Sequence, residues 1–235
     1  MQSLLILASV ATVVSLSLSF QRPLNCDIPN SPPAYLLNGI DVKAPILPQS
    51  ASLPDSIGAP LDAIGATYIP SLLPPAFCAS IISAVSSCAL QTKHSEKNLH
   101  SSLQLFADDD TIDYLTAAIL PHIKGSLPGN KFHGPATFKC LNRRFRLYKY
   151  EGESADTFLP HIDAGWPPSH LIDRNTALAN DTTNPLIGSR FSLLLYLTDS
   201  FDGGETTFLN AITRERICQI KPSGRCLAVP ASPRQ

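Results

Sequence analysis

Two helical patterns followed by strand patterns alone are the feature that most constrains the fold of this chain. Residues 74–90 begin with Pro and carry apolar side chains at helical spacing, and residues 109–123 begin with Asp and do the same. A short strand pattern precedes them at 67–73, and from residue 143 onward the patterned segments are those of strands. This order predicts an α+β fold in which a β-sandwich or barrel carries the chemistry.

The expected strand at 143–150, RRFRLYKY, alternates between apolar and polar side chains. Because successive residues of a strand point to opposite faces, the pattern predicts what each face of this strand carries. Phe145 and Leu147 are expected on one face, and the opposite face is expected to carry Arg146, Tyr148 and Tyr150.

The segment 189–199, SRFSLLLYLTD, is almost continuously apolar, which predicts a strand that is covered on both faces. A turn and a strand are expected at 201–209, and two strands joined by a Pro-x-x-Gly turn are expected at 216–229. Residues 91–101 and 164–189 are polar and are expected to form loops.

The N-terminal residues 1–20 contain a short apolar run followed by small residues, which is typical of a secretory signal peptide. An uncleaved membrane anchor and a buried hydrophobic segment remain as alternatives, and the junction SLSFQRP resembles signals for complex algal plastids. The expected localisation is therefore the secretory pathway or endoplasmic reticulum, with a membrane anchor or an algal plastid as alternatives. Residues 21–62 are rich in Pro, Ser and Asn and are expected to be a linker, which places the folded domain at 63–235.

The charge balance narrows the classes of partner. The formal net charge is −1, whereas nucleic acids and acidic membrane surfaces call for a basic excess. No nucleic-acid partner is therefore expected, and membrane association is expected only through the N-terminus. The six cysteines match no zinc-binding spacing.

The stretch FLPHIDA, at 158–164, contains the first candidate for chemistry. An extended chain places His161 and Asp163 on one face, about 6.5 Å apart along the strand. An imidazole and a carboxylate so placed can bind adjacent positions of one ion, and a second His would complete the facial triad of non-haem Fe(II). A lone His-x-Asp is also common as plain polar alternation, so the pair alone does not decide between these interpretations.

Four segments, RLYKY, FLPHID, SLLLYLTDSFDGGETTFL and KPSG, occur in an order that resembles the prolyl 4-hydroxylase-like family of 2-oxoglutarate- and Fe(II)-dependent dioxygenases. The resemblance covers residues 66 to 230, and YLTDSFDGGETTF is its most specific part. It implies a double-stranded β-helix, or jelly roll, with the His-x-Asp strand at the barrel mouth. It also implies that O2 and 2-oxoglutarate are used to hydroxylate an unactivated C–H, with release of succinate and CO2.

The resemblance implies roles for individual residues. His161 and Asp163 become the iron ligands, and Tyr150, Tyr148 and Tyr196 face 2-oxoglutarate, with ordinary core packing as the alternative for the tyrosines. The implied cofactors are Fe(II), 2-oxoglutarate as cosubstrate, and L-ascorbate. The implied substrate is a peptidyl proline or a small molecule.

Further residues near these motifs have two interpretations each. Trp166 either forms a lip over the substrate or packs in its Pro-flanked loop. Gly203 and Gly204 are expected to serve the turn rather than a ligand, and Glu205 and Thr206 are expected to support that turn.

The family pattern is incomplete after residue 222. No His follows His170, so the distal iron ligand has no counterpart, and neither does the basic residue that grips the far carboxylate of 2-oxoglutarate. Arg225 and Arg234 fall in the wrong places. Three explanations remain open, namely an incomplete chain, a degenerate relative, or a substitute ligand such as His133 or His170. A catalytically inactive binding module of the same fold, without metal, is the alternative function.

Overall fold

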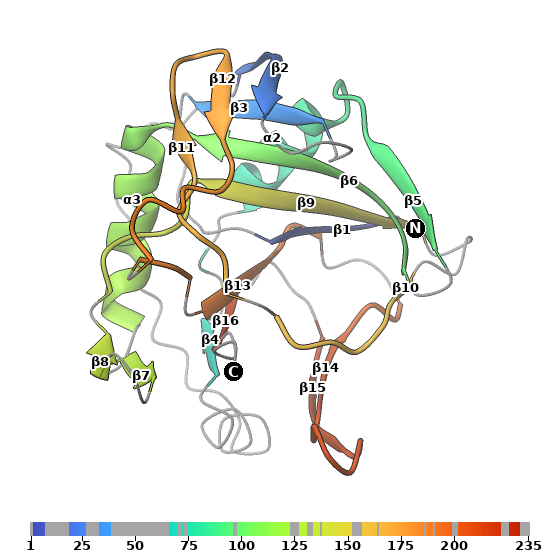
Figure 1. Ribbon diagram of the computed structural model, residues 1–235. Coiled ribbons are helices and arrows are strands. Elements are labelled where there is room, and N and C mark those ends of the chain that lie inside the picture. The colour runs from blue at the N-terminus through green and yellow to red at the C-terminus, as the bar shows by residue number, and fades with distance from the viewer. Residues whose placement is uncertain are drawn as a thin grey trace.

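The structure is a computed structural model of the 235-residue chain. It describes residues 2–7, 19–26, 33–38, 66–69, 72, 75–95, 98–122, 127–130, 134–136, 138–151, 157–163, 165–185, 187–189, 191–198, 202–221 and 226–230. Within these ranges the fold mixes α and β structure, with many strands and few helices (Figure 1). The predicted α+β class agrees with this composition of elements.

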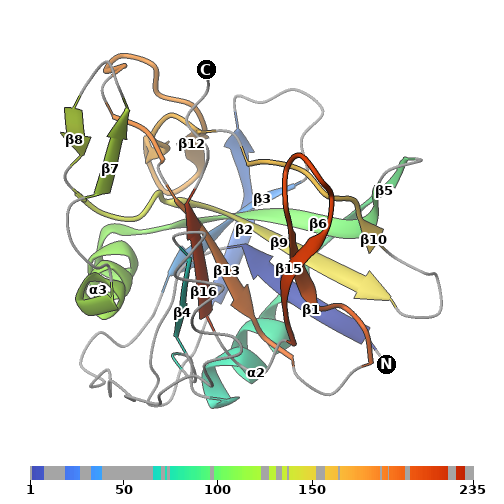
Figure 2. The ribbon, with the colours of Figure 1, turned by 90° about the horizontal axis from the view of Figure 1, so that it is seen from below.

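One sheet contains most of the strands (Figures 1 and 2). Its strands lie in the order β11 (His170–Leu171), β12 (Thr176–Leu178), β2 (Ser19–Cys26), β3 (Ala34–Asn38), β6 (Asn98–Ala107), β9 (Arg144–Glu151), β1 (Gln2–Leu7), β13 (Phe191–Tyr196), β16 (Cys226–Pro230) and β4 (Thr67–Ile69). Two further strands, β5 (Gln91–Ser95) and β10 (Thr157–Phe158), both pair with β6. Separate two-stranded sheets are formed by β7 (Leu127–Asn130) with β8 (Gly134–Ala136) and by β14 (Thr206–Leu209) with β15 (Arg216–Ile220).

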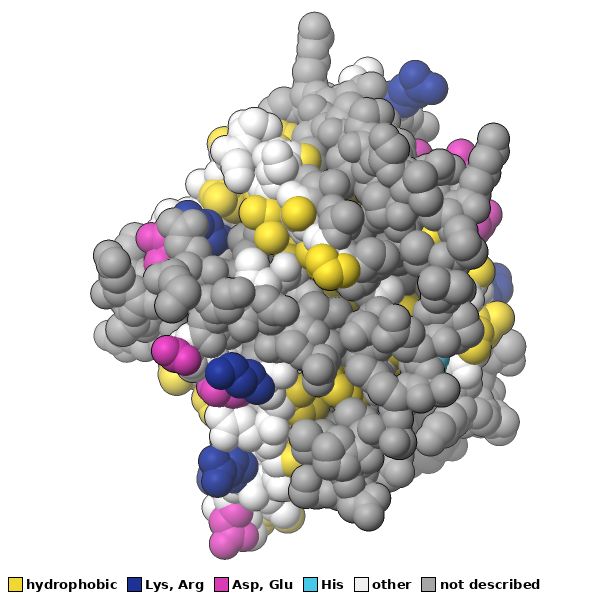
Figure 3. Space-filling view, turned by 180° about the vertical axis from the view of Figure 1, so that it is seen from behind, with side chains coloured by type: hydrophobic (Ala, Val, Ile, Leu, Met, Phe, Trp, Pro, Cys, Tyr) yellow, Lys and Arg dark blue, Asp and Glu magenta, His cyan; other side chains and the backbone are white. Residues whose placement is uncertain are grey.

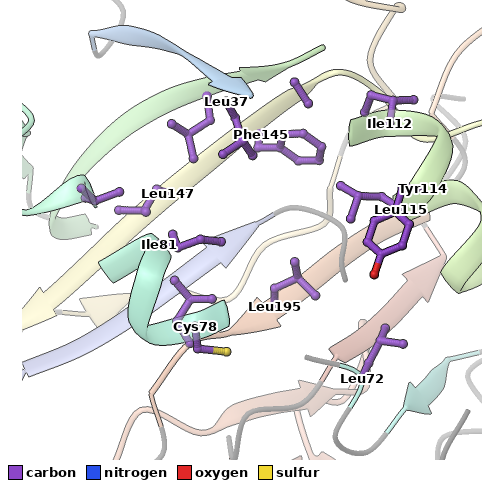
Figure 4. Close-up of a cluster of buried hydrophobic side chains, with 14 of the residues drawn as sticks. Leu37, Leu72, Cys78, Ile81, Ile112, Tyr114, Leu115, Phe145, Leu147 and Leu195 are labelled. Carbon is purple, nitrogen blue, oxygen red and sulfur yellow. The ribbon is translucent and has the colours of Figure 1, made fainter. Parts of the chain in front are cut away.

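Two helices cover one face of this sheet, as expected from their apolar spacing (Figure 4). α2 (Pro75–Val85) and α3 (Asp109–Ile119) bury one stripe each against the sheet. The stripes and the strand residues that they meet belong to one hydrophobic cluster, which includes Cys78, Ile81, Val85, Ile112, Leu115, Ile119, Leu103, Leu147 and Leu195. The short 3-10 helix η1 (Leu120–His122) follows α3.

The start of α3 is defined by a capping interaction. The Asp108 carboxylate accepts a hydrogen bond from the Thr111 backbone N–H at 2.9 Å, which satisfies one of the free N–H groups of the first turn. Asp109 and Asp110 add negative charge there, where the helix dipole favours it.

The strand register separates the sheet into two chemically different faces. Leu103, Leu147, Ile6 and Leu195 lie in one row across β6, β9, β1 and β13, and this row faces the helices through its buried leucines. The neighbouring row, on the opposite face, contains Ser102, Tyr148, Leu5 and Tyr196. The predicted faces of the strand at 143–150 are therefore confirmed, and Arg146 and Tyr148 lie on the face away from the helices.

The loop expected at 91–101 is wrong, because β5 and the beginning of β6 occupy this stretch. β6 is paired on both sides, with β3 and β9, and it continues to Ala107. Its Gln104 side chain is fully buried, at 0% exposure. Polar side chains alternate with leucines in β6. The polar residues suggested an exposed loop, but tertiary contacts bury them.

The linker expected at 21–62 also differs from the structure where that range is described. The segment Ala34–Leu37 is buried at 2–6% exposure, and β3 pairs in parallel with β6, with Ala34 opposite Gln104. The apolar run AYLL belongs to the domain, although its flanks are rich in Pro and Asn. Residues 39–62 lie outside the described residues.

The N-terminal segment lies inside the sheet. β1 pairs antiparallel with β9 on one side and with β13 on the other, with Leu5 opposite both Tyr148 and Tyr196. The structure thus shows residues 2–7 as a strand paired on both sides, and the three expectations for residues 1–20 stay predictions. Among the described residues, no helix has the length and apolar character needed to cross a membrane.

The remaining strand predictions were confirmed in part. β4 lies within 67–73, β13 within 189–199, β14 within 201–209, and β15 and β16 within 216–229 or one residue beyond. The loop expected at 164–189 instead contains the short strands β11 and β12. The expected turn glycines, Gly203 and Gly204, have φ values of 78° and 70°, a left-handed conformation that glycine adopts without steric cost.

Candidate functional site

His161 and Asp163 lie on an irregular segment that follows β10, rather than on the strand that was expected. Their side chains nevertheless meet, with 3.1 Å between His161 Nε2 and Asp163 Oδ1. Both are accessible, at 50% and 38% side-chain exposure. The i, i+2 contact of the two side chains is therefore present, although the segment is irregular rather than a strand.

Both ring nitrogens of His161 face oxygen acceptors. Nδ1 lies 2.9 Å from the Leu159 carbonyl oxygen, and Nε2 lies against the Asp163 carboxylate. A carbonyl oxygen can only accept a hydrogen bond. Nδ1 therefore carries a proton and donates a hydrogen bond to the Leu159 carbonyl oxygen. Nε2 then either carries a second proton or directs its lone pair at a cation shared with Asp163. The hydrogen bond with Asp163 raises the pKa of His161 from its ordinary 6.5, against an opposing effect of burial.

The carboxylate of Asp163 interacts with side chains from two strands of the sheet, β13 and β9. The hydrogen bond with His161 lowers its pKa from the ordinary 3.8, burial opposes this shift, and a hydrogen bond with the Ser192 side chain on β13 adds to it. The positive charge of Arg146 on β9 lowers the pKa of Asp163 further. Asp163 is therefore held ionised, as a metal ligand must be.

An aromatic cluster lies beside His161 on the same face of the sheet. The Phe158 ring is 4.6 Å from the His161 ring and 5.4 Å from the ring of His100, centroid to centroid. His100, on β6, is buried and also meets Tyr148 edge-on at 4.8 Å and Tyr150 at 5.9 Å. Tyr148 and Tyr150, two of the predicted pocket residues, thus join the same aromatic cluster as His161 through His100 and Phe158. His100 was missed because residues 91–101 were expected to form a loop.

Tyr196, the third predicted pocket residue, is buried and has a different partner. Its hydroxyl is hydrogen-bonded to Thr206 Oγ1 at the start of β14, and its ring packs with Tyr68 and Ile220 in a second hydrophobic cluster. This contact fits the core-packing alternative for Tyr196. It also shows how Thr206 supports the chain after the double-glycine turn.

Trp166 packs over the guanidinium groups of two arginines. Its ring centroid lies 5.5 Å from Arg144 Cζ and 5.3 Å from Arg146 Cζ, distances at which cation–π attraction operates. The Arg144 Nε–H donates to Gln104 Oε1 at 2.6 Å. Of the two interpretations of Trp166, packing is therefore present, although the side chain keeps 40% exposure.

The loop that carries Trp166 is held by two hydrogen bonds between Trp166 and Ser189, one to the Ser189 side chain and one between backbone groups. The Trp166 N–H donates to Ser189 Oγ, and the Ser189 N–H donates to the Trp166 carbonyl oxygen, both at 2.8 Å. A Cβ on Gly165 would lie 3.3 Å from the Ser189 carbonyl oxygen, and one on Gly188 would lie 3.3 Å from the Trp166 carbonyl oxygen. The two glycines therefore permit the close approach that positions the tryptophan.

The fit to an iron centre is incomplete. Among the residues that the structure describes, no three His, Cys, Asp or Glu side chains are grouped so that they could hold a metal ion. His170 pairs with Asp181 instead, at 3.0 Å between Nε2 and Oδ2, and His133 lies outside the described residues. His161 and Asp163 can occupy two positions of a facial triad, and the described part of the chain supplies no third protein ligand.

Compared with known proteins, the chain matches no family model, no curated protein sequence and no solved structure.

Proposed function

We propose that this chain carries part of the active site of a 2-oxoglutarate- and Fe(II)-dependent dioxygenase of the prolyl 4-hydroxylase-like type, built on a jelly-roll core. The observation that supports this most directly is the His161–Asp163 pair, in which His161 Nε2 and Asp163 Oδ1 are 3.1 Å apart. The other ring nitrogen, Nδ1, is hydrogen-bonded to the Leu159 backbone carbonyl. Metal-ligating histidines commonly show this second hydrogen bond, because it orients the ring and makes the other nitrogen a better donor.

In this proposal each residue of the pair has a partner that orients it. The Leu159 carbonyl keeps the proton on Nδ1 of His161, so that Nε2 is available to the metal. The Ser192 hydroxyl orients the Asp163 carboxylate. The bound metal supplies the activation of O2 for oxidation of 2-oxoglutarate and of a peptidyl-proline or small-molecule C–H. The third ligand comes from outside the described residues, and L-ascorbate is the expected reductant.

The surface around the pair suits a peptide better than a polyanion. Ile162, between the two ligands, is exposed, and so are Leu159 and Trp166. The face of the molecule shown in Figure 3 carries described acidic and basic side chains that alternate along its left edge rather than gather by sign. The absence of a nucleic-acid partner stays a prediction from the near-zero net charge.

The second candidate function is a catalytically inactive binding module of the same fold. The observation that favours it is that His161 Nε2 and Asp163 Oδ1 lie within hydrogen-bonding distance, so the two side chains can satisfy each other. An imidazolium and a carboxylate at the surface are stable in this form, so the pair alone does not require iron.

Metal binding separates the two candidates. Co(II), a spectroscopic substitute for Fe(II), is titrated into the purified chain and into His161→Ala, with His170→Ala as the matched control because His170 forms a similar exposed pair with Asp181. The dioxygenase proposal expects weak Co(II) binding that His161→Ala abolishes and His170→Ala preserves. Equal binding by the wild type and His161→Ala would favour the inactive module.

Turnover gives a second comparison. With Fe(II), ascorbate and 2-oxoglutarate, we expect little succinate from the chain of 235 residues, because its described residues supply two protein ligands and two hold iron more weakly than three. Robust turnover that His161→Ala removes would show that a third ligand is present after all.

Sequencing the transcript beyond the Gln235 codon would show whether an in-frame His and a later Lys or Arg follow, and a stop codon there would contradict an incomplete chain.

A further inference from the structure

We propose that Arg146, with Arg144 and the ring of Trp166, forms a binding site for a carboxylate group of a small dicarboxylate, beside the His161–Asp163 pair. The inference deepens the function proposed above and rests on it for the identity of the ligand alone. It assigns the role of carboxylate anchor to residues of β9.

The two arginines share one face of the sheet. The register places Arg146 opposite Gln104 and Arg144 opposite Phe106 on β6, and residues two apart on a strand project from the same side. Both are half-buried, and both guanidinium groups lie under the Trp166 ring. Asp163 and Tyr148 belong to the same face, so the arginines lie next to the candidate metal ligands.

Arg146 has only a partial counter-charge among the described residues. The Asp163 carboxylate interacts with it through space, while the hydrogen bonds of Asp163 go to His161 and Ser192. Among the described residues, the ion pairs join Arg143 to Asp109, Lys149 to Glu151, His161 to Asp163 and His170 to Asp181, and none includes Arg146. A half-buried guanidinium with incomplete compensation favours an anion.

Arg146 lies over the Trp166 ring, and among the described residues its guanidinium takes part in no ion pair. A guanidinium that lies against an aromatic ring uses its flat face, whereas its five N–H donors point outward in its own plane. That planar fork matches the two oxygens of a carboxylate. Arg144 commits its Nε to Gln104, so Arg146 is the principal ligand-binding group and Arg144 adds charge.

The site is organised before any ligand arrives. Gln104 orients Arg144, and the two hydrogen bonds between Trp166 and Ser189 hold the ring in place. Preorganised donors lose less conformational entropy on binding. Two arginines next to a carboxylate suit a small dicarboxylate rather than a nucleic-acid backbone, which needs an extended basic surface.

Trp166 provides a reporter of this site, because it is the only tryptophan in the chain. The full chain is titrated with 2-oxoglutarate and with succinate, in buffer with a chelator so that no metal contributes, and tryptophan fluorescence is followed. Succinamide, which has the same carbon skeleton and no charge, is the matched ligand control. We expect a saturable change with both dicarboxylates and none with succinamide.

Three variants test the assignment. Arg146→Gln should weaken dicarboxylate binding about tenfold or more, and Arg146→Lys should fall between it and the wild type because it keeps the charge and loses the fork. Arg216→Gln is the control, since Arg216 is exposed on β15 and bonds to Gln219. Asp163→Asn should tighten binding by about twofold to fivefold, because it removes the competing negative charge. A role in folding alone would not produce this opposite sign.

The outcomes are distinguishable from those of the metal experiment. Dicarboxylate binding that survives His161→Ala while Co(II) binding is lost supports both proposals. Dicarboxylate binding without any Co(II) binding supports the carboxylate site and contradicts the dioxygenase. The carboxylate site is wrong if succinamide acts like succinate. It is also wrong if Arg146→Gln binds dicarboxylates as well as the wild type and the Arg216→Gln control do, with the folding of both variants checked by circular dichroism.

Discussion

At the scale of single residues, the surroundings of His161 and Asp163 decide what the pair can do. Hydrogen bonds to Leu159 and Ser192 orient the two side chains, and the half-exposed setting leaves room for a ligand. The His-x-Asp spacing predicted the pair, but the orienting groups come from other parts of the chain or from an irregular backbone. The same holds for Trp166, whose arginine partners lie on β9.

The pH dependence of stability should report this pair. The raised pKa of His161 contributes stability that is fully present below 6.5 and is lost as the pH rises through the raised value. The lowered pKa of Asp163 contributes stability that is fully present above 3.8 and is lost as the pH falls through the lowered value. The pair therefore stabilises the fold most between these two ordinary pKa values.

Urea unfolding of the wild type and Asp163→Asn measures this contribution. The variant should lose about 0.2–1 kcal/mol of unfolding free energy at about pH 5.5, because exposed pairs contribute this much. The loss should shrink at about pH 8.5, because the contribution of the pair declines as the pH rises through the raised pKa of His161. A loss of the same size at both pH values would contradict the assigned coupling.

At the scale of elements, the face of the sheet away from the helices assembles the site. β9 contributes Arg146 and Tyr148, β13 contributes Ser192, and β6 contributes His100 and Gln104, and the register aligns them. The β14–β15 hairpin belongs to a separate sheet. It is attached to β13 through the hydrogen bond between Tyr196 and Thr206 and through packing around Ile220.

The bond between Tyr196 and Thr206 should be measurable by a double-mutant cycle. Tyr196→Phe keeps the buried ring and should cost about 0.5–1.5 kcal/mol of unfolding free energy, as the loss of one hydrogen bond does. Thr206→Val should cost a similar amount, and the double variant should cost less than the sum of the two. The control is Thr207→Val, at the exposed neighbouring position. Strict additivity of Tyr196→Phe and Thr206→Val would contradict the coupling.

At the scale of the whole molecule, distant parts of the chain join one sheet. β1 lies between β9 and β13, and β3 pairs with β6, so segments on both sides of the expected domain boundary at residue 63 contribute to the sheet. The alternation within β6 and the AYLL run of β3 were signals of this arrangement. Their polar or Pro-rich surroundings favoured a loop and a linker instead.

A fragment of residues 63–235 should therefore be much less stable than the full chain, since it lacks both β1 and β3. In the full chain, Leu36→Ala should cost about 2–5 kcal/mol because Leu36 is buried at 2% exposure. Leu120→Ala, at an exposed site, should stay within about 0.5 kcal/mol. Thermal unfolding followed by circular dichroism gives these comparisons. Cooperative unfolding of the fragment at the temperature of the full chain would restore the boundary at residue 63.

The sequence by itself determined the local structure of this protein. Local structure depends on the sterics and hydrogen bonds of neighbours within a few residues. It includes the spacing of apolar side chains in α3 and β9, the Asp108 cap, the turn glycines and the closeness of His161 to Asp163. Only the tertiary structure decided which strands pair, that β1 fills the position between β9 and β13, that His170 meets Asp181, and that Trp166 covers two arginines. Such contacts join residues far apart in the chain, and their free energy depends on burial and charge that no local pattern contains.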